Sequence, residues 1–99
     1  MSANAEQTNN LTILRDIYDF YTNCYREKTG KPHPLLTKKQ KNDVLDTINE
    51  NAERLGIDNF EDWQKLIVAH FERSLKTDWN INHFTAGMII ELLFYDVLY

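Results

Sequence analysis

Cysteine, glycine and proline are scarce in this chain, with one, three and two residues among 99. A small secreted domain usually carries an even set of cysteines that pair, so the single Cys24 indicates a reducing compartment. With so few glycines and prolines there is little to punctuate a many-stranded sheet. The scarcity of these residues therefore favours an all-α fold before any pattern is considered.

Long apolar runs are also lacking. The most apolar stretch, Met88 to Tyr99, contains two carboxylates and is shorter than the roughly 20 residues that a membrane-spanning helix needs. Residues 1–10 are small and polar, without the apolar segment of a signal peptide, and we expect a disordered tail there. The remaining residues, 11–99, have the length of one domain. The sequence thus predicts a soluble, single-domain protein that is not embedded in a membrane.

The apolar pattern predicts a small bundle of about four helices. The first is expected over residues 11–28, where apolar side chains recur at helical spacing on one broad face. Gly30 is well placed as the C′ residue that ends this helix. The two prolines then predict an extended connector over residues 31–36, because each disfavours helical backbone at the residue before it.

Two further helices have clear start and stop signals. Thr37 and Gln40 have the spacing of a capping box, which predicts that the second helix begins there. Gly56 is expected to end that helix in the left-handed conformation. Asp58 or Asn59 then serves as the N-cap of a third helix, whose first turn is acidic and so complements the helix dipole.

The fourth helix is expected to start at an Asn82 cap and to reach the C-terminus, with Gly87 as a tolerated interior glycine. Trp79 and Ile81 are expected to pin the preceding link to the core. Residues 88–98 place apolar side chains in every direction, and a helix that is apolar all round is buried all round. We expect this helix to lie at the centre of the bundle; the alternative is that one side of it meets another copy of the chain in a homodimer.

Residues with catalytic or metal-binding chemistry are scattered. His33, His70 and His83 stand on three different elements without paired ligand spacing, and Cys24 lies on an apolar helix face. His70 is expected in the core and His83 beside the Asn82 cap. We therefore expect no enzyme, no metal, no cofactor and no small-molecule substrate.

Charge is distributed unevenly along the chain, whose net charge is −4. Residues 26–41 carry six basic side chains and one acidic one, whereas residues 42–99 carry four basic and eleven acidic ones. Clustered cations beside a helix N-terminus suit phosphate groups, although a solvated loop would show the same composition. The candidate residues for binding nucleic acid or a protein partner are Arg26, Lys28, Lys31, Lys38, Lys39 and Lys41.

The second helix also carries an acidic stripe almost opposite its apolar face. Such a stripe could imitate a phosphate backbone and occupy a nucleic-acid-binding partner, but any solvated helix carries charge on that face. The residues of this alternative site are Asp43, Asp46, Glu50 and Glu53.

Several stretches over residues 18–99, taken in order, resemble the conserved C-terminal module of phage replisome-organiser and replication-initiation proteins. The resemblance begins with Tyr25-Arg26-Glu27-Lys28-Thr29-Gly30-Lys31, then a Thr37-Lys38-Lys39 helix start and an Arg54-Leu55-Gly56 helix end. An acidic-capped helix from Glu61 to Ile67, a tryptophan link and a last helix ending in aromatic residues follow. The chain departs from the family over residues 81–87, where members usually carry a YLRP-x-TLF-like segment.

The resemblance implies the module alone, without the DNA-binding winged-helix domain that family members also carry. It further implies a phage or mobile-element protein that works in the cytoplasm of a bacterial host cell. Its expected role is in DNA replication, through contacts with a replication protein or nucleic acid. The alternative is a small phage-encoded inhibitor, comparable to an anti-CRISPR protein or an inhibitor of host replication, that binds a host protein through its acidic face.

Overall fold

A computed structural model describes the backbone of residues 2–99 and the side chains from residue 13 onwards, and Met1 lies outside this description. The described residues form helices and no strands, which confirms the predicted all-α class. The elements are α1 (Ser2–Thr29), α2 (Lys38–Leu55), α3 (Phe60–Arg73), the 3₁₀ helix η1 (Lys76–Asp78), α4 (Ile81–Phe84) and α5 (Ile89–Val97).

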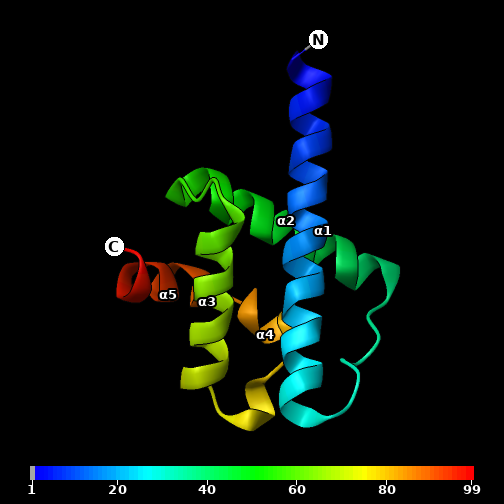
Figure 1. Cartoon of the computed structure of the whole chain (residues 1–99), viewed down its shortest axis with the longest axis vertical. Helices are drawn as coiled ribbons and strands as arrows, with labels where there is room; N and C mark the ends of the chain where they lie inside the picture. Colours follow the sequence, from blue (N-terminus) through cyan, green and yellow to red (C-terminus); the bar gives the residue numbers. More distant parts are fainter. Residues whose placement is uncertain (1) are drawn as a thin grey trace.

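The helices pack around α3 and the C-terminal half of α1, which run side by side (Figure 1). Helix α2 crosses α1, while α5 packs on the other side of α3 from α1. All of these elements contribute side chains to one core. Its largest fully buried members are Ile17, Tyr21, Ile48, Trp63, Leu66, Ile67, Ile81 and Phe84.

Helix α1 begins at Ser2 rather than at residue 11, where the apolar pattern placed its start. The disordered tail that the sequence predicts over residues 1–10 stays a prediction. Helical backbone from Ser2 onwards is compatible with the composition, since this stretch contains no proline or glycine and includes good helix formers such as Ala3 and Ala5. Once a helix is nucleated, each added residue gains a hydrogen bond, so an apolar face is not needed to continue it.

The signals around the connector are confirmed. Gly30 has a φ of 72° and follows the end of α1, and residues 31–37 contain no helix. The Thr37 hydroxyl accepts a hydrogen bond from the Gln40 amide at 3.1 Å, and the Gln40 side chain accepts one from the Thr37 amide at 2.9 Å. Gly56 ends α2 with a φ of 70°.

Helix α3 uses Asn59, one of the two predicted caps, whose side chain accepts from the Asp62 amide at 2.9 Å. The next helix differs from the prediction, because Asn80 and not Asn82 is the N-cap of α4. The Asn80 side-chain oxygen accepts from the Asn82 amide at 2.7 Å. Both asparagines suit a cap, and the helix begins earlier because Ile81 is fully buried in its first turn.

The predicted fourth helix is two helices. Gly87 has a φ of 52°, a left-handed conformation that interrupts the chain between α4 and α5. The expectation of an unbroken helix with an interior glycine was therefore wrong. The helix α5 also lies at the side of the molecule rather than at its centre (Figure 1), with Ile90 and Leu93 inward and Leu92 and Tyr95 exposed.

Candidate nucleic-acid interface

The six predicted cations are carried by three consecutive pieces of structure on one side of the molecule (Figure 1). These pieces are the last turn of α1, the connector of residues 31–37 and the first turn of α2. All six side chains are exposed. We call them the basic segment, which consists of Arg26, Lys28, Lys31, Lys38, Lys39 and Lys41.

The cations of the basic segment differ from most others in their partners. Within the side chains that the structure describes, none of the six lies within ion-pair distance of a carboxylate. Elsewhere Arg54 pairs with Glu91 at 2.5 Å, Lys65 lies 3.9 Å from Asp62, and Arg73 pairs with Asp96. The positive charge of the basic segment is therefore available to an external anion.

A helix end adds to this positive potential. Lys38, Lys39 and Lys41 stand in the first turn of α2, where the helix dipole places partial positive charge. Cations are unfavourable at this end of a helix, and an acidic residue there would usually offset the dipole. A bound phosphate would relieve this repulsion, because it interacts favourably with both the lysines and the free amides.

A shallow groove separates α1 from the connector beside these cations. Its volume is about 260 Å³, and Arg26 lines it together with the polar side chains of Thr22 and Asn23. A second hollow of about 220 Å³ lies next to it, lined by Arg15 and Lys41, and Tyr18 lines both. The Lys41 ammonium lies 4.8 Å from the centre of the Tyr18 ring, which is a cation–π contact.

Arg15, Tyr18, Thr22 and Arg26 form one stripe along α1 at this groove. Arg15 and Tyr18 were not among the predicted site residues, because Arg15 belongs to an acidic stretch of sequence and Tyr18 lies on the apolar face of the first helix. The spacing of three or four residues from Arg15 to Arg26 was the signal that could have found them.

His33 holds the connector that carries the basic segment. It is buried, and its Nε2 accepts a hydrogen bond from the Ile81 amide at 3.1 Å. Its Nδ1 lies 2.9 Å from the Pro34 carbonyl, so this nitrogen carries the proton in the neutral ring. Its ring packs against Tyr25 at 5.0 Å between centroids, and burial lowers its pKa. This one side chain fastens the connector to α1 and to the start of α4.

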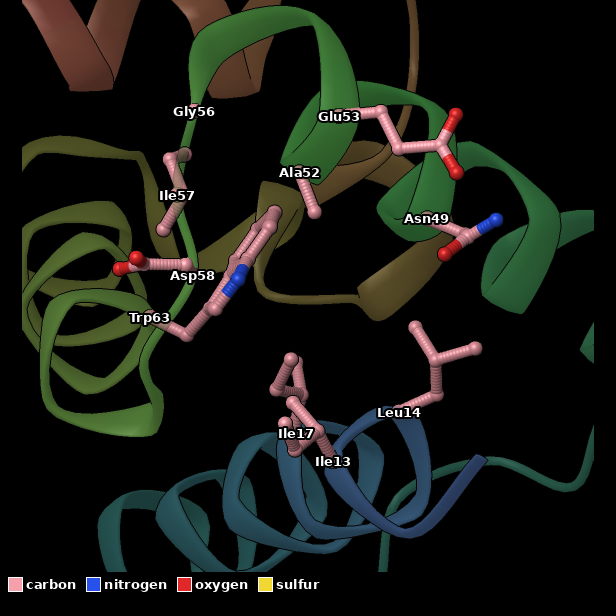
Figure 2. Close-up of a pocket in the computed structure, with 10 residues that line it drawn as sticks. All are labelled: Ile13, Leu14, Ile17, Asn49, Ala52, Glu53, Gly56, Ile57, Asp58 and Trp63. Atoms are coloured by element: carbon pink, nitrogen blue, oxygen red, sulfur yellow. The ribbon is translucent and has the colours of Figure 1, made fainter. Parts of the chain in front are cut away.

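The acidic stripe on α2 is exposed along its whole length, from Asp43 through Asp46 and Glu50 to Glu53. At its end, Glu53 stands on the rim of a cavity of about 360 Å³. Figure 2 shows Glu53 above this cavity, with apolar side chains of α1 below it and Trp63 of α3 at one side. The sequence did not indicate that the stripe leads to an apolar hollow.

The other candidate groups are His70, His83 and Cys24. Burial lowers the pKa of His70 to about 4, helped by His83, whose ring centre lies 5.3 Å away. His83 follows Asn82 in α4, whose cap is Asn80, and its ring packs against His70, 3.9 Å from the Asp78 carboxylate. Burial raises the pKa of the Cys24 thiol, which makes it a poorer nucleophile. In the described part of the chain, no three metal-ligating side chains come together.

Within residues 2–99, no helix combines the length and apolar character needed to cross a bilayer. Comparison of the chain with protein families, characterised proteins and solved structures gives no match. The functional assignment therefore depends on the residues and their geometry.

Proposed function

We propose that the chain is a non-enzymatic accessory module of a phage or mobile element that acts in DNA replication. It does so by binding nucleic acid, or the anionic surface of a replication protein, through the basic segment. The observation that carries the proposal is that six exposed cations stand on three consecutive segments of the chain without carboxylate partners in the described structure. Nucleic acid is the first choice of ligand because its regularly spaced phosphates match such a surface.

The geometry favours contacts with phosphate groups over the reading of bases. Lysines and arginines that neutralise phosphates release condensed counterions, so affinity falls steeply with salt. The groove beside Tyr18 adds the polar side chains of Thr22 and Asn23, which can donate hydrogen bonds to phosphate oxygens. Such a surface would fix the module on a nucleic acid strand with little dependence on sequence.

Removing two cations of the basic segment should weaken DNA binding more than removing two cations elsewhere. The test pair is Lys38→Ala/Lys39→Ala and the matched control is Lys65→Ala/Lys76→Ala, which makes the same change in net charge. We expect the first variant to bind labelled duplex DNA about tenfold more weakly at low salt and its salt slope to fall by about 1 to 2. The control should remain within about threefold of the unmodified protein.

Equal weakening in the two variants would mean that only net charge matters and would refute the assignment to the basic segment. Circular dichroism spectra of both variants establish that the helices are intact, which is expected because all four side chains are exposed.

A second candidate function follows from the acidic stripe. Glu53 lines the cavity of Figure 2 together with apolar side chains, so this face could accept an apolar side chain of a partner with negative charge beside it. It suits a basic surface of a host protein, as an inhibitor would require. We expect the charge reversals Asp46→Lys and Glu50→Lys to abolish capture of that protein from host lysate while leaving DNA binding no weaker. Undiminished capture by this double variant would eliminate the candidate.

A further inference from the structure

Helix α5 and the residues next to it present an apolar stripe to solvent. Its members are Met88, Leu92, Tyr95 and Tyr99, with exposed fractions of 61%, 60%, 52% and 89%. They recur at spacings of four, three and four residues, the repeat with which paired helices interlock their side chains. The opposite side of the helix is buried through Ile90 and Leu93, so the stripe is the outer face of a helix anchored on α3.

The aromatic residues of the stripe pack on one another. The rings of Tyr95 and Tyr99 lie 5.2 Å apart, and each also packs against Phe94. The Tyr99 amide donates to the Phe94 carbonyl at 3.0 Å, which continues the turn beyond the end of α5. Large aromatic rings that already pack on one another bury much area for little loss of conformational entropy, so they suit a contact surface.

We propose that this stripe binds the same stripe of a second copy, as an antiparallel two-fold homodimer. The spacing of four, three and four reads the same in both directions, so a two-fold axis between residues 93 and 94 places Met88 opposite Tyr99 of the partner copy. It also places Leu92 opposite Tyr95 of that copy. Each aliphatic side chain thus meets an aromatic ring, and each methionine sulfur meets a tyrosine, which is a favourable pairing.

The charges beside the stripe permit this contact. Glu91 lies on one flank and Asp96 on the other, and in an antiparallel pair each flank meets its own copy. Unpaired carboxylates would repel there, but Glu91 is paired with Arg54 and Asp96 with Arg73 within the chain. Each flank is therefore neutral and can exchange its arginine contacts with the neighbouring copy.

The exposed area of the stripe limits the affinity expected for the dimer. Four side chains with these exposed fractions present on the order of 500 Å² per copy. A standard interface takes about 800 Å² from each partner, so the dimer is near the lower limit of stable association. We expect a dissociation constant of about 1 to 100 µM.

Molecular mass in solution over a dilution series tests the proposal. The unmodified protein should pass from dimer to monomer with dilution, and Leu92→Asp should stay a monomer at about 100 µM. Leu35→Asp is the matched control, because Leu35 is 99% exposed and lies far from the stripe in the connector. It should dimerise as the unmodified protein does. A monomeric unmodified protein at this concentration, or equal effects of the two variants, would overturn the proposal.

A cross-linking experiment tests the antiparallel register in a Cys24→Ser background. The double variant Met88→Cys/Tyr99→Cys should oxidise to a covalent dimer, because each new cysteine faces the other type in the partner copy. Met88→Cys alone should not, since the two copies of residue 88 are about 16 Å apart along the helix axis in this arrangement. Efficient cross-linking of the single variant would indicate a parallel pair and contradict the proposed arrangement.

Discussion

Replacing Trp63 with alanine is expected to lower the free energy of unfolding by about 3 to 5 kcal/mol. Trp63 is 1% exposed, packs edge-to-face against Phe84 at 6.5 Å between ring centres, and forms one wall of the cavity beside α1. Truncation would remove the largest fully buried side chain from the place where α1, α2 and α3 meet. The existing cavity would grow, because the structure around a truncated core side chain relaxes only partially into the space.

Urea denaturation followed by circular dichroism measures this effect, and Val68→Ala in the same helix is the control. Val68 is 40% exposed, so its truncation should change the free energy of unfolding by no more than about 0.5 to 1 kcal/mol. A loss below about 1 kcal/mol for Trp63→Ala would show that Trp63 is not a central packing residue.

The protein is expected to lose about 3 kcal/mol of stability through His70 as the pH falls from about 6.5 to about 4. His70 is fully buried, and its folded-state pKa of about 4 lies below the ordinary value of 6.5, mainly because burial disfavours the charged ring. Between these two values the unfolded chain binds a proton that the folded chain does not, so acid favours unfolding. The loss levels off below the folded-state pKa.

The variant His70→Phe isolates this contribution. It keeps a ring among Tyr21 and Phe84 but removes the titrating nitrogens and the contact of Nδ1 with the Ser74 hydroxyl at 3.2 Å. Over the same pH range the variant should lose about 3 kcal/mol less stability than the unmodified protein does. A smaller loss should remain from His33, because burial also lowers the pKa of that residue. Identical pH dependence in the variant and the unmodified protein would contradict the assignment. Stability is measured by urea denaturation at each pH.

Local signals in the sequence predicted much of the fold. The capping box of Thr37, the left-handed Gly56 and the extended proline connector depend on residues within four positions of one another, and all three are present. The break at Gly87 was missed because an isolated glycine costs a helix only about 1 kcal/mol, so its sequence fits an interior position equally well. The break at Gly87 instead depends on tertiary contacts, because Ile81 and Phe84 before it and Ile90 after it are all buried in the core.

The residues of the basic segment could be predicted from the sequence, but their contacts with other side chains could not. Six clustered cations are visible in the sequence. Whether they have carboxylate partners depends on the positions of the acidic side chains in space, and among the side chains from residue 13 onwards Glu91, Asp62 and Asp96 pair with other cations. The role of His33 in holding the connector could not be predicted either, because the Ile81 amide that donates a hydrogen bond to it is distant in sequence. The apolar surplus of the last helix was recognised, and the structure places part of it outside the core.

A homodimer of this chain would have two DNA-binding surfaces. The basic segment and α5 lie on opposite sides of the molecule in Figure 1, so a dimer formed through α5 would carry one basic segment at each outer end. Two linked weak sites bind a polymer much more tightly than one does when both can be engaged. DNA affinity would then rise with protein concentration, and Leu92→Asp would remove that rise without altering the basic segment.

A nucleic-acid interface on the basic segment is tested by titrating labelled single- and double-stranded DNA with the unmodified protein at two salt concentrations, about 50 mM and 200 mM. We expect binding at the lower concentration that weakens about a hundredfold or more at the higher one, because affinity falls this steeply with salt when four or more phosphates are contacted. Absence of binding to either DNA at the lower salt concentration would contradict a nucleic-acid interface on the basic segment.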